Sequence, residues 1–180
     1  MRLRMLASSL LALSLGSGLV GSCGSSTVRV PIADGSDQYR EVQKIDCSVY
    51  DTRRKELTVG LNFSLLFGAA SAGPQVTSAT ETGVKWDKSV QAIVAQYKEL
   101  CARFNAGAIS QPSYDARLGE IDQLWSEAQG IRQSADTVIR GHSDKAFGEL
   151  DKETGGGANA DAQQVVASVD NLYSKVGGGR

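Results

Sequence analysis

Five consecutive residues in the second half of the chain bring together the side-chain types of a hydrolytic triad. Arg140, Gly141, His142, Ser143 and Asp144 place a base, a nucleophile and an acid side by side. A working triad needs these groups to converge in space along a chain of hydrogen bonds, whereas neighbours on a helix point in different directions. We therefore expect a polar turn or an exposed helix face here. The sequence predicts no catalytic residue and a protein that is not an enzyme.

Residues that could hold a metal ion or a phosphate group are scarce. One histidine and three cysteines leave little material for a structural zinc site, which uses four Cys or His ligands. The glycine runs at 155–157 and 177–179 lack the Lys-Ser/Thr pair of a phosphate-binding loop. Acidic and basic residues are interleaved along the second half of the chain, as on a solvated helix face. We expect no metal and no cofactor.

The thiol of Cys23 follows a segment with the organisation of an export signal. Arg2 and Arg4 form a short basic start, residues 6–15 are apolar apart from serines, and residues 16–22 are small or aliphatic. This order of regions describes a signal peptide. The apolar stretch is shorter than the roughly 20 residues that span a bilayer comfortably. We therefore expect residues 1–22 to be removed.

The five residues Leu19-Val20-Gly21-Ser22-Cys23 resemble the lipobox of bacterial lipoproteins. The resemblance implies cleavage before Cys23, followed by attachment of diacylglycerol to its thiol and often of an acyl chain such as palmitate to its amine. Several chains are needed because one acyl chain anchors a protein only marginally. Since Gly24 is not the Asp that retains many such proteins at the inner membrane, we expect a lipid anchor in the outer membrane, facing the periplasm.

Cleavage would leave a mature chain of 158 residues in which 17 basic residues face 20 acidic ones, for a net charge of −3. That length fits one domain. The charge balance gives no clustered basic surface, so we expect no binding to nucleic acid. In an oxidising envelope, Cys47 and Cys101 either form a disulfide or are separately buried as small apolar side chains. Pairing cannot be deduced from sequence, and counting free thiols would distinguish these alternatives.

Residues 41–67 carry the alternation that is typical of β-strands. Around Cys47 apolar and polar residues alternate, and a longer run continues this period of two after the charged connection at 51–56. We therefore expect a β-hairpin over 41–67, with 23–40 as a flexible tether. In that tether the patch at 28–32 could add a short edge strand, because Pro31 excludes a central one. The longer run consists of Leu57, Val59, Leu61, Phe63, Leu65 and Phe67.

The rest of the chain has helical periodicity after a loop predicted at 68–83. Apolar residues recur every three or four positions in two long stripes, which predicts a helical hairpin over 84–151. Gly107 suits the helix C-terminus, and Ser110 with Pro112 suits the next N-terminus. Residues 152–180 contain a glycine-rich segment and a short amphipathic stripe, which predicts a third helix or a frayed tail. The fold class is mostly α, with an αα-hairpin and a C-terminal helix preceded by a two-stranded β-hairpin.

The turn of the helical hairpin, Tyr97-Lys98-Glu99-Leu100-Cys101-Ala102-Arg103-Phe104-Asn105-Ala106-Gly107-Ala108-Ile109-Ser110, is followed by Tyr114 and Leu118. This segment resembles the short helical-hairpin module called SHOCT, over about residues 93–124. Here Ser113 replaces the acid that usually precedes the aromatic residue. The resemblance implies a role in oligomerisation or binding and brings no catalytic residues with it.

These observations favour a non-enzymatic, lipid-anchored envelope protein that binds an envelope partner, or copies of itself, through its helical hairpin. The alternative is a subunit of an oligomeric outer-membrane pore or secretion channel, because the run at 57–67 has the length of a membrane strand, about 9–11 residues. A hydrolase is a third hypothesis, but the sequence gives no argument for a pocket.

Overall fold

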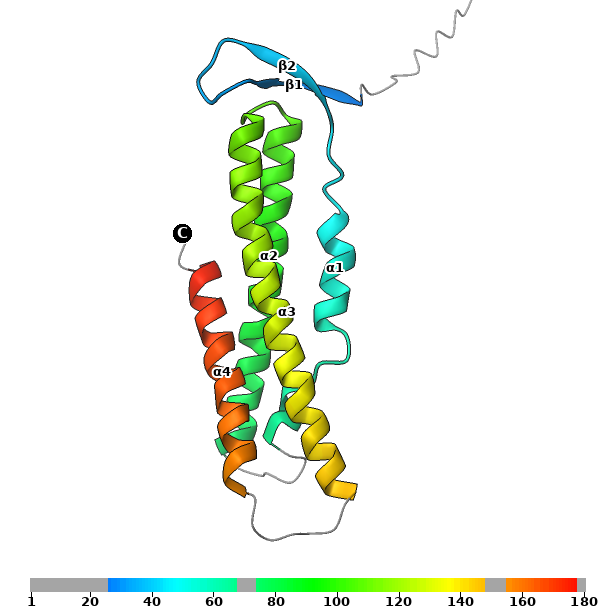
Figure 1. Cartoon of the computed structure of the whole chain (residues 1–180), viewed down its shortest axis with the longest axis vertical. Helices are drawn as coiled ribbons and strands as arrows, with labels where there is room; N and C mark the ends of the chain where they lie inside the picture. The colour runs from blue at the N-terminus through cyan, green and yellow to red at the C-terminus, as the bar shows by residue number, and fades with distance from the viewer. Residues whose placement is uncertain (1–25, 68–73, 148–154, 178–180) are drawn as a thin grey trace, which may run out of the picture.

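The structure is a computed structural model that describes residues 26–67, 74–147 and 155–177. It is mostly helical, and a two-stranded antiparallel β-hairpin precedes the helices, which confirms the predicted fold class (Figure 1). In chain order the elements are β1 (Thr27–Pro31), β2 (Tyr39–Gln43), α1 (Val49–Thr58), the short 3-10 helix η1 (Phe63–Phe67), α2 (Pro74–Asn105), α3 (Gln111–Phe147) and α4 (Gly155–Gly177).

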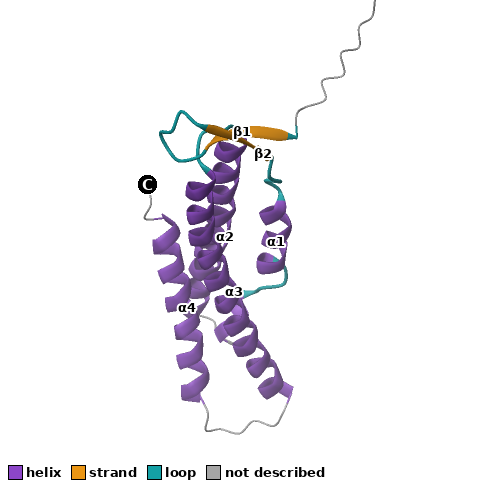
Figure 2. Cartoon of the chain, turned by 45° about the horizontal axis from the view of Figure 1, so that its top comes forward, coloured by secondary structure: helices purple, strands orange, loops and turns teal. Residues whose placement is uncertain are grey.

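The helices differ in length, and the two longest form the antiparallel hairpin that organises the molecule. At 1.5 Å per residue, α2 is about 48 Å long, α3 about 56 Å, α4 about 34 Å and α1 only about 15 Å. Helix α4 packs against both α2 and α3, while α1 lies on the other side of the hairpin (Figures 1 and 2). The predicted third helix is therefore present over 155–177.

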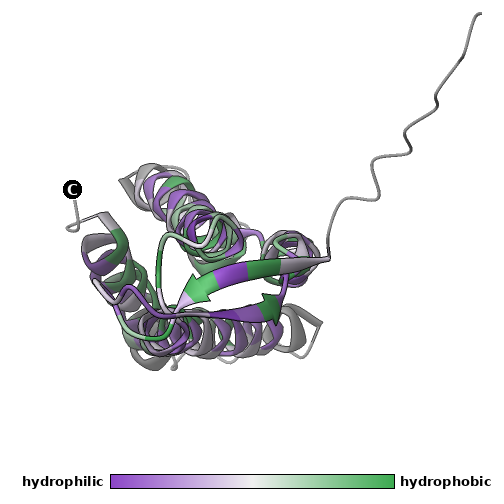
Figure 3. Cartoon of the chain, turned by 90° about the horizontal axis from the view of Figure 1, so that it is seen from above, coloured by the Kyte–Doolittle hydropathy of each residue, from purple (hydrophilic) through white to green (hydrophobic). Residues whose placement is uncertain are grey.

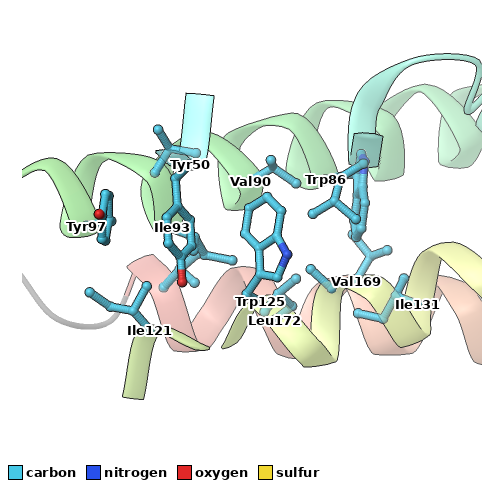
Figure 4. Close-up of a cluster of buried hydrophobic side chains, with 14 of the residues drawn as sticks. Tyr50, Trp86, Val90, Ile93, Tyr97, Ile121, Trp125, Ile131, Val169 and Leu172 are labelled. Atoms are coloured by element: carbon cyan, nitrogen blue, oxygen red, sulfur yellow. The ribbon is translucent and has the colours of Figure 1, made fainter. Parts of the chain in front are cut away.

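The apolar stripes that predicted the helical hairpin form its core. Every residue of the first stripe is at least 95 % buried, and so are the aromatic members of the second. Their large side chains fill the space between α1, α2, α3 and α4 (Figure 4). The first stripe consists of Trp86, Val90, Ile93, Tyr97, Leu100 and Phe104, and the second contains Tyr114, Ile121, Trp125, Ala128, Ile131 and Ala135.

The turn between α2 and α3 has the chemistry predicted for it. Gly107 adopts a φ of +71°, a left-handed conformation that glycine reaches without steric cost. The backbone N–H of Ala108 donates to the Arg103 carbonyl at 2.9 Å. At the start of α3, the backbone N–H of Ser113 donates to the hydroxyl of Ser110 at 3.4 Å, so Ser110 caps the helix.

The predicted position of the β-hairpin is wrong. The strands lie at 27–31 and 39–43, inside the segment expected to be a tether, and the connection predicted at 51–56 is part of helix α1. The reason is visible in the burial: Tyr50 and Leu57, seven residues apart, are the two buried residues of α1. Seven residues are two helical turns, so both lie on one face of a helix. The short patch expected to add an edge strand forms β1.

The run proposed as a membrane strand is divided among three local structures. Leu57 lies in the last turn of α1, the chain turns at Gly60 with a φ of +78°, and η1 starts at Phe63. The burial does not alternate, because Leu57 and Leu66 are buried whereas Val59 and Leu65 are exposed. Tertiary contacts with the helical hairpin therefore override the period of two. This corrects the prediction for Leu57, Val59, Leu61, Phe63, Leu65 and Phe67.

The predicted loop at 68–83 is also partly wrong. Helix α2 begins at Pro74, and proline suits the first helical position because its missing N–H would have no partner there. Ala79 and Thr82 are already buried against the bundle. Residues 68–73 lie outside the described part, as do the predicted signal peptide at 1–22 and the lipidation site Cys23.

Replacing Leu57 with alanine tests the corrected assignment, because an alternating strand would bury Leu57 and Val59 alike. Leu57 is 3 % exposed and Val59 is 66 % exposed. We expect Leu57→Ala to lower the free energy of unfolding by about 2–5 kcal/mol. The control Val59→Ala should change it by no more than about 0.5 kcal/mol. Urea unfolding measures both values, and equal losses would restore the strand interpretation.

Candidate interaction surface

The β-hairpin lies across the tip of the helical hairpin, over the turn between α2 and α3 (Figure 3). Val28 pairs with Val42, and Arg29 pairs with Glu41. Because partners in an antiparallel pair share a face and successive residues alternate, Val28 and Val42 are on the face opposite to Arg29 and Glu41. Val28 lies beside Gly107, so the face with the charged pair is directed away from the helices.

The approach of the strand to the turn requires glycine at position 107. A Cβ atom there would come far inside van der Waals distance of the Arg29 carbonyl oxygen. Gly107 therefore meets two demands at once, the left-handed backbone of the helix C-terminus and the close passage of β1.

The loop between the strands closes the other side of the tip. The carboxylate of Asp34 accepts a hydrogen bond from the backbone N–H of Ser110 at 2.9 Å and another from the hydroxyl of Ser113. These hydrogen bonds lower the pKa of Asp34, and the bond from the Ser113 hydroxyl contributes most. Asp34 thus supplies the N-terminus of α3 with the negative charge that such ends favour. Asp34 and Ser110, which make this contact, are 76 positions apart in the chain.

The segment that follows β2 is clamped to α2. The side-chain amide of Asn105 bonds both backbone groups of Ile45: its Oδ1 accepts from the N–H and its Nδ2 donates to the carbonyl, each at 2.8 Å. The hydroxyl of Tyr97 donates to the Asp46 carbonyl at 2.9 Å. Next to these bonds, a disulfide joins Cys47 to Cys101, with the Cα atoms 5.6 Å apart.

The disulfide answers the question that the sequence left open about these two cysteines. It bridges 54 positions of the chain, and closing a loop of this size removes enough unfolded-state entropy to stabilise the fold by about 4 kcal/mol in the chain-entropy description. Together with Asn105 and Tyr97 it holds the β-hairpin to the helical hairpin at one point. The orientation of the β-hairpin over the tip depends on this clamp.

Tyrosine hydroxyls near the clamp have structural roles. The ring of Tyr50 stacks on Tyr97 at 4.2 Å between centroids and meets Trp125 edge-on at 5.1 Å, and its hydroxyl donates to Asp122. Burial raises the pKa of Tyr50 most, and the hydrogen bond to Asp122 raises it further. Burial likewise raises the pKa of Tyr114 to about 12. These hydroxyls stay protonated at neutral pH and act as hydrogen-bond donors.

A groove opens between α2 and α3 where α4 ends. It has a volume of about 420 Å³, and its deepest side chains, Leu100 and Ile121, are at least 95 % buried. Helix α4 is held alongside by ion pairs from Lys85 to Asp170 at 2.7 Å and from Lys175 to Glu127 at 2.8 Å. The groove is lined by Gln96, Glu99, Leu100, Arg103, Arg117, Glu120, Ile121, Leu124 and Lys175.

This groove continues the course of α4 toward the tip. Lys175, in the last turn of α4, forms part of its lining. Since α4 is about 14 Å shorter than α2 at 1.5 Å per residue, no helix among the described residues covers this side of the helical hairpin near its tip. A further helix placed end to end with α4 would cover the half-buried Leu124 and the charged side chains around it. We call this lined surface the α2–α3 groove.

Two other cavities are less suited to a partner. One of about 210 Å³ lies beside η1 and contains Trp86, whose buried Nε1 lacks a hydrogen-bond partner in the described part of the chain. The other, of about 630 Å³, lies between α3 and α4, near the end where these helices diverge in Figure 2. Its rim is formed mainly by uncharged polar side chains such as Gln133 and Gln164.

Within residues 26–67, 74–147 and 155–177, no group of three His, Cys, Asp or Glu side chains is placed to hold a metal ion. Positions 142–144, which carry the triad residue types, are consecutive positions of α3. No helix of this same part combines the length and apolar character needed to cross a membrane. Comparison with protein-family models, curated proteins and solved structures finds no match to the chain.

Sequence reasoning missed the residues that join the two hairpins. Asp34 and Asn105 make bonds to backbone groups 76 and 60 positions away, and such partners leave no periodic signal. The one local signal is Ser110 at the start of α3, which identifies a helix N-terminus where an acidic side chain is favoured. It does not identify which of the chain's acids would occupy it.

Replacing Gly107 with alanine tests the close passage of β1 over the turn. We expect Gly107→Ala to destabilise the protein more than Gly35→Ala, because Gly35 has a similar positive φ but no atom within 4 Å of the added Cβ. The strained backbone alone costs about 1–2 kcal/mol, so the excess for Gly107→Ala reports the clash with Arg29. Thermal unfolding measures the difference. Equal losses would show that the β-hairpin does not rest on the turn.

Proposed function

We propose that this chain is a non-enzymatic, lipid-anchored protein of the cell envelope that acts as an interaction module through its helical hairpin. The α2–α3 groove is the observation that carries the proposal. It has apolar side chains at its base and charged ones at its rim, and α4 packs against the same two helices farther from the tip. Grooves of this kind bind an amphipathic helix through residues spaced three or four apart.

The rim charges favour a partner helix with both signs of charge. Arg103, Arg117 and Lys175 face the groove together with Glu99 and Glu120. An apolar seam flanked by interleaved Lys and Glu would match this rim, and like charges placed opposite each other would disfavour other partners. Another envelope protein or a second copy of this chain could supply such a helix.

The turn of the SHOCT-like segment is covered by the β-hairpin. Ile109 and Ser110 are at least 95 % buried, and Gly107 lies against β1. The binding role that the resemblance implies therefore falls, in our proposal, on the sides of α2 and α3. The alternative of a pore subunit loses its supporting observation, because residues 57–67 form helix and turn.

Removing the thiol of Cys23 tests the lipid anchor. We expect Cys23→Ser to move the protein from the membrane fraction to the buffer-extracted fraction, because the acyl chains supply the attachment. The variant Cys47→Ser with Cys101→Ser serves as the control, since it removes the disulfide and keeps the anchor. Fractionation of cells followed by immunodetection measures the distribution. Retention of Cys23→Ser in the membrane would contradict the proposal.

Photo-cross-linking in intact cells tests the groove. A photoreactive amino acid at Glu120, on the rim, should give a protein adduct, because a bound helix would lie within reach. At Gln123, exposed on the same helix outside the groove, it should give none. Mass spectrometry of the adduct separates a second copy from another protein. The absence of an adduct from both positions, or turnover of a substrate that one substitution abolishes, would contradict the proposed function.

A further inference from the structure

The geometry points to a second attachment to the membrane: the β-hairpin rests its outer face on the phospholipid surface, so the helical bundle stands with its tip toward the bilayer. This inference depends on the proposed lipid anchor at Cys23. It adds a contact that the anchor does not itself require. The argument starts from the length of chain between the anchor and the fold.

Only a short stretch separates the acylated residue from the β-hairpin. Thr27 begins β1 and follows Cys23 by four positions, and a fully extended chain covers at most about 3.6 Å per residue. The first strand is therefore held within about 14 Å of the acyl chains. The predicted tether of 18 residues, 23–40, would have allowed the domain to move freely, but the β-hairpin begins within it, at Thr27.

The anchored end is at the tip of the bundle. The β-hairpin crosses over the α2–α3 turn at one end of the long axis (Figures 1 and 3). The anchor therefore brings the tip, and neither the sides nor the far end, close to the bilayer. Since the face of the sheet with Arg29 and Glu41 is directed away from the helices, that face is the one presented to the lipid.

The outer face carries residue types that suit the membrane interface. At the end of the hairpin farthest from Cys23, Tyr39 lies on this face and is 52 % exposed. Ile32, which directly follows β1 at the same end, is 47 % exposed. Tyrosine concentrates at the headgroup level of membranes because its ring is apolar and its hydroxyl is polar. Tyr39 and Ile32 therefore give this end of the hairpin exposed apolar surface.

Exposed basic side chains lie between the anchored end of the β-hairpin and the end that carries Tyr39. Lys44 is beside the anchored end, because its backbone N–H donates to the Ser26 carbonyl at 2.7 Å, and Arg29 lies on the outer face between the ends. Lys44 and Arg29 are exposed and belong to none of the ion pairs found in the described residues. Each is free to approach a lipid phosphate, which contributes about 1 kcal/mol per basic residue near an anionic surface. Arg40 pairs with the buried Val30 and therefore belongs to the opposite face.

Two of the four acids of the same segment make hydrogen bonds within the fold. Asp34 binds the N-terminus of α3, and Asp46 accepts hydrogen bonds from the backbone N–H and hydroxyl of Ser48, each at 2.8 Å. Asp37 and Glu41 remain exposed. On the outer face itself Arg29 is paired directly with Glu41, so the charges of the two strands balance there. A face without net charge suits zwitterionic headgroups, which carry both signs of charge, and gives no preference for a strongly charged protein partner.

Photolabelling from position 39 tests this contact. The full chain, expressed with its signal, carries p-benzoylphenylalanine in place of Tyr39 or, as the matched control, in place of Tyr173. Tyr173 is 36 % exposed on α4, which ends short of the tip. After reconstitution in vesicles of phosphatidylethanolamine and phosphatidylglycerol, we expect lipid adducts from position 39 several times more abundant than from position 173.

The outcomes separate this inference from the proposed anchor. Equal labelling at both positions, no lipid adduct at either, or only a protein adduct at position 39 would overturn the inference. If Cys23→Ser releases the protein from cell membranes in the same strain, such a result leaves the anchor intact. As a second measurement, Ile32→Ser in the chain labelled at position 39 should reduce the lipid adducts, whereas Val84→Ser, at a residue 49 % exposed on α2, should not.

Discussion

The inequality of helix lengths is the constraint on which the rest of this structure depends. A hairpin of two helices of about 48 and 56 Å exposes two long apolar valleys, one on each side. Helix α4 covers only part of one valley, and α1 with η1 covers part of the other. The chain has no further helix among its described residues, so the upper part of the α4 side remains as the α2–α3 groove. The candidate interaction surface is therefore a direct consequence of where α4 ends.

The tip of the hairpin raises a different problem, which the β-hairpin solves. The ends of α2 and α3 leave backbone groups without partners inside the helices, and a two-stranded sheet is not stable alone. Each element supplies what the other lacks: Asp34 binds the start of α3, and Asn105 binds the backbone of Ile45. The disulfide between Cys47 and Cys101 secures the clamp. In the oxidising compartment that the lipobox resemblance implies, this bond would persist.

The sequence predictions were correct where the structure depends on residues close together in the chain, and wrong where it depends on contacts between distant residues. Stripes such as Trp86, Val90 and Ile93 have a period that helices alone produce over many turns, so α2 and α3 were predictable and their cores are confirmed. The turn at Gly107 was predictable because it depends on local backbone geometry. The strand prediction for residues 49–67 was wrong because a short alternation of apolar residues has the same appearance in a strand and in a helix followed by a turn. Only the bundle decides that Leu57 is buried and Val59 is exposed.

The sequence by itself determined the helical hairpin, the capping residues of its turn and the mainly helical class, since these depend on residues a few positions apart. It also determined the expectation of a lipid anchor, through the order of residues before Cys23. The tertiary structure alone decided where the β-hairpin lies, that Cys47 pairs with Cys101, and which stretch of α2 and α3 stays uncovered. Those outcomes arise from contacts between residues tens of positions apart, whose partners are chosen by shape and hydrogen-bond geometry after the helices have packed.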